Sequence, residues 1–304
     1  MADVKNYQEV VDIASKHLGK VGGDGYKNTY DPSLLVPIPR KLNREAYGIK
    51  EDNIPFKGYD VWNAYEVSAI TEKGLPVSGM LKITCPADTE FHVESKSIKL
   101  YLNSFNMTPI GRNTKECIDI IEARVSRDLT ELLGGHCSAR MYLSDLGATY
   151  GFKGYAKLGA LCDLDDIEFK SYKSDATQLE VDSSITEVEE ISWQSDLLRS
   201  NCRVTNQPDW GDVFIRMKGA KLPTPEALAK YIVSHRQVSH FHEEICEMMY
   251  THLTEAFQPE ELMVACLYTR RGGIDINPVR ASHAYLIPAF FYDKNLRLEK
   301  TLRQ

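Results

Sequence analysis

The sequence contains two segments that look like diverged copies of one unit, and such a repeat restricts the possible folds more than any single motif. A Pro-x-x-Gly turn at residues 76–79 precedes a stretch, 81–85, that is apolar at alternate positions. A second Pro-x-x-Gly turn begins 132 residues later, at 208–211, and precedes a similar stretch at 213–217. Because alternate apolar positions are typical of strands with one buried face, both stretches are predicted to be β-strands.

The elements predicted after each strand follow the same order in both halves. A short helix comes first, then a long amphipathic helix, then a closing strand: 95–103, 113–134 and 137–143 in the first half, and 226–233, 241–257 and 263–269 in the second. One further strand is expected before each copy. This order predicts an α+β fold of two tandem modules, each an antiparallel sheet with helices packed on one face. Coincidence is the alternative, since Pro-x-x-Gly is common turn chemistry.

The two modules are expected to lie between segments of different character. We assign residues 1–55 to an N-terminal extension, 56–160 to the first module, 161–190 to an acidic connection and 191–304 to the second module. The extension has three prolines within eight residues, which favours extended backbone packed on a surface. Between positions 163 and 190 there are ten acidic residues against two lysines, as expected of a solvated segment.

The charge and the cysteine content of the chain argue against several classes of protein. The net charge of −7 disfavours a nucleic-acid partner, which would need a basic face. No apolar run approaches the roughly 20 residues that span a bilayer, and the N-terminus lacks signal-peptide features, so we expect no membrane partner and a cytoplasmic location. Seven cysteines without CxxC spacing predict reduced thiols, with neither disulfides nor a metal site.

Cys202 is the first candidate for chemistry. It lies in a polar, turn-rich stretch before a predicted strand, and Asp209 follows seven residues later. A free thiol with a pKa of about 8.5 is mostly protonated at neutral pH, so a nucleophilic cysteine needs an activating neighbour. The alternative is a small packing cysteine and a turn aspartate.

Three further polar clusters are candidates for binding. His242 and Glu243 begin the long second helix, Lys96 lies between two serines near the start of 95–103, and an Arg-Arg-Gly-Gly segment occupies 270–273. Cationic side chains beside serines or glycines suit a phosphate group. Each cluster also has a structural alternative, as a polar helix terminus, a solvated helix or a charged turn. Because neither a G-x-G-x-x-G fingerprint nor a P-loop occurs, any dinucleotide would have to be held by such side chains.

Taken together, these clusters resemble the NADPH-dependent 7-cyano-7-deazaguanine reductases of queuosine biosynthesis in their long, two-module form. The resemblance covers nearly the whole chain and is carried by the segments 30–40, 58–66, 94–101, 200–211, 241–243 and 270–278. These segments occur in the family's order. Val36 and Arg203 are interpreted as neutral variation around the motifs.

The resemblance implies a tunnelling fold (T-fold), a homodimer, and reduction of the nitrile of 7-cyano-7-deazaguanine to an aminomethyl group through a Cys202 thioimide and two hydride transfers from NADPH. The implied catalytic residues are the nucleophile Cys202, the proton shuttle Asp209 and the proton donor His242. The implied substrate contacts are Glu94, Ser95, Lys96, His242 and Glu243. The implied cofactor contacts are Lys96, Ser97, Arg271 and Gly272. Arg271 is expected to contact the cofactor alone.

Other functions stay open at this point. A nitrile amidinotransferase would use the same cysteine without NADPH, and segment 94–101 would then have no purpose. A purine- or pterin-binding T-fold protein without catalysis would need neither Cys202 nor Asp209. A cyclohydrolase-like enzyme would need a zinc site that these cysteines do not offer. Oxidation of NADPH in the presence of the nitrile distinguishes these functions.

Overall fold

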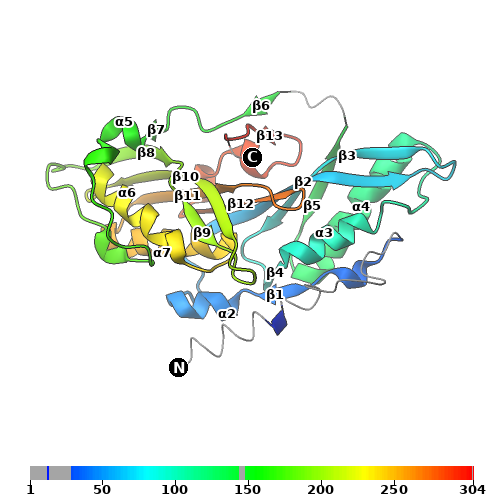
Figure 1. Ribbon diagram of the computed structural model, residues 1–304, viewed down its shortest axis with the longest axis horizontal. Helices are drawn as coiled ribbons and strands as arrows, with labels where there is room; N and C mark the ends of the chain where they lie inside the picture. Colours follow the sequence, from blue (N-terminus) through cyan, green and yellow to red (C-terminus); the bar gives the residue numbers. More distant parts are fainter. Residues whose placement is uncertain (1–11, 14–28, 144–147, 303) are drawn as a thin grey trace.

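A nine-stranded, largely antiparallel sheet runs through the molecule and joins the two halves of the chain (Figure 1). The structure is a computed structural model that describes residues 12–13, 29–143, 148–302 and 304. The strands follow the order β5-β3-β2-β12-β11-β10-β8-β7, with β9 paired to β10 beside this path, and β7–β8 is the parallel pair. The strands of this sheet are β2 Lys57–Ile70, β3 Pro76–Pro86, β5 Ser138–Tyr142, β7 Ala156–Lys157, β8 Glu189–Ser195, β9 Arg199–Asn201, β10 Pro208–Gly219, β11 Glu261–Tyr268 and β12 Ile274–Ala281.

The two halves meet where β12 pairs with β2. Ile274 lies opposite Ala64 and Ala281 lies opposite Lys57, so the pairing runs the length of β12. Each half contains the predicted order of two strands, two helices and a strand: β2, β3, α3, α4, β5, and then β8, β10, α6, α7, β11. The prediction of an α+β fold with antiparallel strands is therefore confirmed. Strand β12 was not among the predicted elements, although it makes the connection between the halves.

The helices begin and end where local sequence signals place them. The Asn113 side chain accepts the Glu116 N–H at the start of α4, and Gly134 ends that helix with a φ of +75°. Thr224 caps α6 by accepting the N–H of Ala227. The α-helices are α2 Lys41–Arg44, α3 Ser95–Asn103, α4 Thr114–Leu133, α5 Leu158–Leu161, α6 Pro225–Ser234, α7 His242–Phe257 and α8 Ala289–Tyr292. The 3₁₀ turns are η2 Pro32–Leu34, η3 Glu45–Tyr47, η4 Leu164–Asp166, η5 Ala176–Gln178, η6 His235–Gln237 and η7 Ala284–Leu286.

Alternation along the strands produces a hydrophobic core on each face of the sheet. On β10, Ile215 is buried in the core that α6 and α7 form with the sheet, while Phe214 belongs to a core on the opposite face. That opposite face is covered by the C-terminal segment, through Leu286 and Phe291. The prediction of helices on one face therefore holds for the long helices α4 and α7, and the short elements η7 and α8 are exceptions to it.

The N-terminal extension contributes to the interior as well as to the surface. Residues 1–11 and 14–28 of it lie outside the described part of the chain. In the described part, β1 Pro37–Pro39 pairs with β4 Phe91–Val93, and Ile38 is fully buried. The backbone is extended as predicted, but this strand is partly buried in the interior, whereas the sequence predicted a segment packed on a surface.

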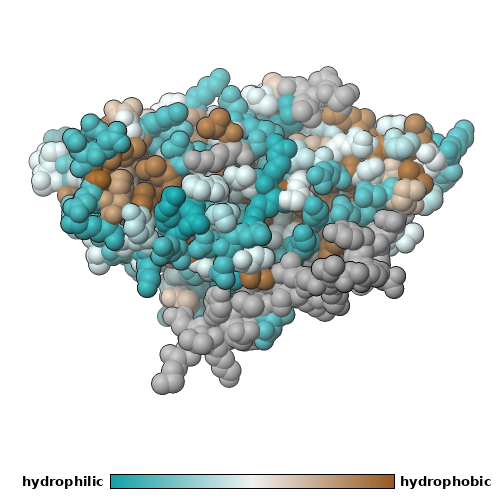
Figure 2. Space-filling model, viewed as in Figure 1, coloured by the Kyte–Doolittle hydropathy of each residue, from teal (hydrophilic) through white to brown (hydrophobic). Residues whose placement is uncertain are grey.

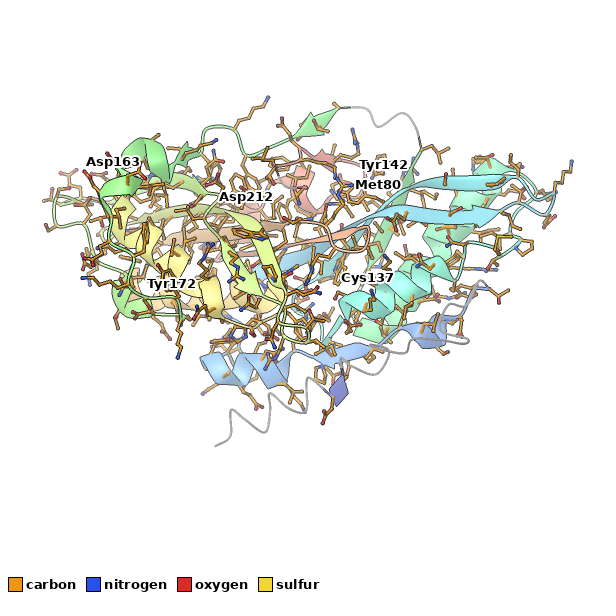
Figure 3. All side chains as sticks on the ribbon, in the orientation of Figure 1. Met80, Cys137, Tyr142, Asp163, Tyr172 and Asp212 are labelled. Atoms are coloured by element: carbon orange, nitrogen blue, oxygen red, sulfur yellow. The ribbon has the colours of Figure 1, made fainter. Side chains whose placement is uncertain are left out.

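The acidic connection runs mostly exposed along the second half. Tyr172, labelled in Figure 3, lies beside the end of α6, where its carbonyl accepts the N–H of Gln237 at 2.9 Å. Apolar side chains of the connection, among them Phe169 and Leu179, pack on the core under α6 and α7. A few buried apolar side chains thus hold this otherwise exposed connection against the second half.

A network of buried charges ties the extension, both halves and α7 together. Asp60 on β2 accepts from Arg40 at 2.6 Å and lies 2.9 Å from Arg280 on β12. Arg280 also donates to Glu247 on α7 at 2.9 Å, and Arg44 donates to the same carboxylate at 3.0 Å. Burial alone would raise the pKa of Asp60, but the two guanidinium groups hold it at about 2. The network therefore stays ionised and cross-links the two halves next to the sheet.

In the described residues no helix is both long and apolar enough to cross a membrane. Hydrophilic residues cover much of the face drawn in Figure 2, with hydrophobic residues scattered among them.

Candidate active site

A cavity of about 410 Å³ opens between the two halves, and the predicted site residues converge on it. The predicted residues on its walls come from the start of α3, the loop after β9, the start of β10, the start of α7, and the turn between β11 and β12. Residues of β2, β4 and β12 complete the lining. The predicted residues that line it are Glu94, Ser95, Lys96, Cys202, Asp209, His242, Glu243, Arg271 and Gly272. A second cavity, of about 530 Å³, contains none of them.

Cys202 lies at the head of a closed loop on the cavity wall. Its N–H donates to the Gln207 carbonyl at 2.8 Å, and its own carbonyl accepts the Asn206 N–H at 2.9 Å. Asn206 has a φ of +53°, a left-handed conformation that asparagine tolerates better than most residues. The Cys202 side chain is partly exposed. The loop thus holds the sulfur at the surface of the cavity.

Asp209 is brought back beside this loop by the β9–β10 hairpin, where it lies opposite Ser200. The carboxylate is 4% exposed. Its Oδ1 accepts from Arg271 Nη1 at 2.8 Å, and its Oδ2 lies 3.4 Å from Nε2 of His242. The His242 ring stacks on Tyr268 with 3.8 Å between centroids. An acid, an imidazole and a guanidinium therefore meet at one point of the wall, a suitable arrangement for moving protons.

Arg271 thus has more contacts than the sequence predicted. It was expected to contact only the cofactor, but it also donates to Asp209 and to the Gln207 side chain of the Cys202 loop. The reason is the pairing of β10 with β11, which brings the turn after β11, and with it Arg271, beside Asp209 at the start of β10. This cation links the turn between β11 and β12 to Asp209 and to the loop that carries Cys202.

Glu94 caps α3 with its side chain on the cavity wall. Oε1 accepts the Lys96 N–H at 2.9 Å and Oε2 accepts the Ser97 N–H at 2.6 Å. Burial raises the pKa of the Glu94 carboxyl above its usual value. Ser95 stays beside it, with its hydroxyl 3.3 Å from Glu94 Oε1.

The predicted role of Ser97 needs correction. Ser97 is fully buried and is absent from the cavity lining. Its hydroxyl donates to the Glu94 carbonyl at 2.7 Å and accepts the Val36 N–H at 3.0 Å. Ser97 follows Glu94 by three residues and lies on the buried face of α3, where its hydroxyl braces the start of the helix. Val36 takes part in the same contact, because its backbone N–H donates to the Ser97 hydroxyl.

Glu243 lines the cavity, and its side chain is almost fully buried. Burial, with a smaller contribution from the Asp60 charge, raises the pKa of Glu243 to about 8. Its Oε1 has no hydrogen-bond partner among the described residues. Nδ1 of His92 lies 3.9 Å away, and burial lowers the pKa of that imidazole to about 4, so it is neutral near pH 7. Buried polar atoms in a folded protein are normally paired, so an unpaired carboxylate oxygen beside a cavity indicates a polar ligand.

Polar and charged groups at the α3 side of the cavity suit an anion. Lys96, Lys99 and Arg271 all line it. Gly272, beside Arg271, has a φ of +59°, and a Cβ there would lie 2.7 Å from the Lys99 ammonium. The glycine therefore leaves room for the Lys99 side chain, which packs against the turn beside Arg271. Among the described residues, no group of three or more His, Cys, Asp or Glu side chains could hold a metal ion.

Comparison with known proteins places the chain in a family. The family model described as "Nitrile reductase, 7-cyano-7-deazaguanine-reductase N-term" matches residues 26–141, and the model described as "QueF-like protein" matches 208–285. A protein of Cupriavidus metallidurans named NADPH-dependent 7-cyano-7-deazaguanine reductase is 43% identical over 260 residues, which is 85% of this chain and 90% of that protein. The chain belongs to the NADPH-dependent 7-cyano-7-deazaguanine reductases. A reductase of the same name from an Azoarcus species is 40% identical over 257 residues, 84% of this chain and 88% of that protein.

The reductase family models cover most of the cavity wall. Glu94 and Lys96 fall within the first matched range, and Asp209, Glu243 and Arg271 within the second. The solved structure of an archaeosine synthase, titled QueF-Like in the apo form, covers 33% of this chain and 96% of its own, with 18% identity and a TM-score of 0.29. That score is too low to bear on the fold of this reductase.

Sequence reasoning missed several residues of the cavity wall. His92 is 3% exposed, neither ring nitrogen has a hydrogen-bond partner among the described residues, and burial lowers its pKa to about 4. Trp62 on β2 and Phe241 before α7 supply an apolar wall. Trp62 and Phe241 fall in segments 58–66 and 241–243, which carry the family resemblance, but an apolar pattern shows only that a residue is buried and not that it borders a cavity. His92 lies outside those segments and had no sequence signal.

Proposed function

We propose that this chain catalyses the reaction for which its relatives are named, the NADPH-dependent reduction of 7-cyano-7-deazaguanine to 7-aminomethyl-7-deazaguanine, in queuosine biosynthesis. The observation that carries the proposal is the convergence of Cys202, Asp209 and Glu243 on one cavity. A thiol beside a proton relay suits addition to a nitrile, and a carboxylate with an unpaired oxygen suits the N–H edge of a guanine-like ring.

The substrate is proposed to bind with its ring toward Glu243 and Glu94. Both carboxyl groups line the cavity and are almost fully buried, so charge-assisted hydrogen bonds to ring N–H groups would be strong. Trp62 and Phe241 give the same cavity an apolar surface for a planar ring. Ser95, Lys96 and His242 complete the proposed substrate contacts.

Cys202 is proposed to add its sulfur to the nitrile carbon. A carbon–sulfur bond forms, one π bond of the nitrile breaks, and the nitrogen takes up a proton to give a thioimide. Asp209 is proposed to relay the thiol proton to that nitrogen. His242, whose Nε2 lies 3.4 Å from Oδ2 of Asp209, is proposed to pass further protons. The carbon–sulfur bond breaks again before the amine leaves, which restores the thiol.

NADPH, as co-substrate, supplies the two hydrides that turn the nitrile carbon into a methylene. The residues proposed to hold it are Lys96, Arg271 and Gly272, and Lys99 joins them on the same wall. Lys99 packs against Gly272, next to Arg271, and this grouping of cations supports the assignment. No metal is proposed, since hydride and thiol chemistry need none.

The finer points of fold and assembly also belong to this proposal. The repeated element order supports a T-fold of two modules at 56–160 and 191–304, with 1–55 as extension and 161–190 as connection. A homodimer is proposed, and the end strand β5 offers an edge for a second copy, where Met80 and Tyr142 pair at the side of the sheet (Figure 3). Reaction in the cytoplasm is proposed because a free thiol and NADPH both need a reducing compartment.

The test is NADPH oxidation by the purified protein in the presence of the nitrile, followed by absorbance. Two NADPH should be consumed for each aminomethyl product formed. The matched control is Cys202→Ala, which should oxidise none. A wild-type protein that binds the nitrile without consuming NADPH would overturn the proposed activity in favour of a binding protein.

A further inference from the structure

Arg203, the residue after Cys202, is buried and ion-paired. Its Nη1 donates to Oε2 of Glu244 at 2.7 Å and to Oδ1 of Asn43 at 2.6 Å. Arg203 is 7% exposed and Glu244 is 3% exposed. Holding a charged pair out of water is costly unless its geometry is good, so this contact is a built feature of the loop. Arg203 is therefore not the neutral variation that the sequence alone indicated.

Glu244 is held firmly on its own side of the contact. The same oxygen accepts from Nδ1 of His240 at 2.8 Å and from the N–H of Phe241 at 3.2 Å. Nε2 of that imidazole lies 3.0 Å from the hydroxyl of Tyr47. Burial alone would raise the pKa of Glu244, but the His240 hydrogen bond and the Arg203 charge lower it. Glu244 is thus an ionised anchor, fixed at the first turn of α7.

The ion pair connects two walls of the cavity. Arg203 immediately follows Cys202 on one wall, and Glu244 immediately follows Glu243 on the other. Consecutive Cα atoms are about 3.8 Å apart, so neither Cys202 nor Glu243 moves far while the pair holds. The distance between nucleophile and ring-binding carboxylate depends on this contact.

Before Cys202, backbone hydrogen bonds tie the loop to the segment that precedes α7. The Asn201 N–H donates to the Val238 carbonyl at 2.8 Å, and the Asn201 carbonyl accepts the N–H of His240 at 3.1 Å. After Cys202, the buried contact to the α7 side is made by the Arg203 side chain. The nucleophile therefore lies between a backbone anchor and a side-chain anchor.

We propose that Arg203 is a positioning residue, which acts through Glu244 to hold Cys202 at the nitrile of a substrate bound at Glu243. The proposal rests on the proposed role of Cys202 as the nucleophile. A displacement of about 1 Å in a reacting group can cost about a hundredfold in rate. Loss of the pair should therefore slow the addition step far more than it weakens binding of the ring.

The experiment measures two quantities on the full chain. Intact-protein mass spectrometry follows the rate of Cys202 adduct formation with the nitrile, without NADPH, and calorimetry gives the Kd of 7-deazaguanine, which has no nitrile. In Arg203→Met the addition rate should fall by about thirtyfold to a hundredfold, while the Kd changes by less than about threefold. Arg203→Lys keeps the charge but loses the planar geometry and should recover part of the rate.

A double variant separates positioning from charge balance and from folding. Arg203→Met with Glu244→Gln leaves no unpaired buried charge, so it should fold even where Arg203→Met alone does not. Its addition rate should stay low. A return to the wild-type rate would overturn the proposal, because Arg203 would then only neutralise Glu244.

A matched control removes an ion pair of similar length away from the cavity. Arg216 Nε lies 2.8 Å from Glu190 Oε1 across the β10–β8 pair, half exposed. Arg216→Met with Glu190→Gln should keep the addition rate within about twofold of wild type. A wild-type protein without a Cys202 adduct would overturn the proposed function itself. A normal adduct rate in Arg203→Met would overturn the positioning role alone.

Discussion

Arg271 donates a hydrogen bond from Nη1 to Oδ1 of Asp209 over 2.8 Å. One guanidinium thus serves the proposed cofactor wall and the proposed proton shuttle together. The same group reaches Gln207 on the Cys202 loop. Cofactor binding and thiol addition are therefore expected to share a residue.

Arg271→Ala is expected to raise the KM for NADPH by about tenfold and also to slow adduct formation by several fold. The second effect follows because Asp209 loses a charge-assisted hydrogen bond. Steady-state kinetics and mass spectrometry measure the two effects separately. Arg270→Ala is the neighbouring control, since the Arg270 guanidinium lies over the Tyr65 ring, 4.3 Å from its centroid. An unchanged addition rate in Arg271→Ala would show that the hydrogen bond between Arg271 and Asp209 does not contribute to the addition step.

Without NADPH, Cys202 is expected to carry the whole mass of the nitrile compound. Addition expels no leaving group, and NADPH should then discharge the adduct as the amine. Cys202→Ala should form no adduct, and Asp209→Asn should lose about a hundredfold or more in rate. Cys162, which is also partly exposed, is an internal control that should stay unmodified. An adduct that persists in Cys202→Ala would contradict the mechanism.

Affinity for the nitrile is expected to increase with pH. The pKa of Glu243 is raised to about 8, first by burial and then by Asp60, against the opposing charges of Arg40 and Arg280. His92, with its pKa lowered to about 4, stays neutral over the range tested. Below about pH 8 the carboxyl must lose a proton to accept the ring N–H groups, so affinity should rise by about tenfold per pH unit toward pH 8 and then level off.

Calorimetric titrations at several pH values test this expectation. Glu243→Gln cannot titrate, so its weaker affinity should not vary with pH in the same way. An affinity that falls as the pH rises would mean that Glu243 binds the ring in its protonated form.

Arg280→Met is expected to lower the free energy of unfolding by about 3–5 kcal/mol. The substitution leaves Asp60 and Glu247 buried with fewer partners, and an uncompensated buried charge is strongly destabilising. Urea denaturation followed by circular dichroism measures the change. Arg216→Met removes a half-exposed pair and should cost about 1 kcal/mol or less. An equal loss of unfolding free energy in both variants would contradict the proposed stabilising role of the buried network between the two halves.

Light scattering in dilute buffer is expected to give about twice the chain mass of 34.4 kDa. The expectation comes from the family resemblance and from the sheet edge at β5. A charged substitution at Tyr142 of that edge should weaken the association if β5 forms the contact. A stable monomer or a decamer would contradict the homodimer.

The sequence by itself determined the local structure and the family. Helices α4 and α6 start directly after Asn113 and Thr224, because these capping side chains accept hydrogen bonds from backbone N–H groups of the first turn. The strands at 81–85 and 213–217 follow from alternating side chains. Such signals act between residues close in the chain, and so they can be read without the fold. The motifs around Glu94 and Cys202 identified the family in the same way.

Only the tertiary structure decided how these pieces combine. The pairing of β12 with β2 joins the two halves. The sequence of neither strand indicates which strand it pairs with, because backbone hydrogen bonds are the same for every residue. The buried contacts of Arg203 and the interior position of Ser97 depend on residues far away in the chain. A cavity is the space left between such distant segments. Its shape and its unpaired groups therefore emerge only when the whole chain is packed.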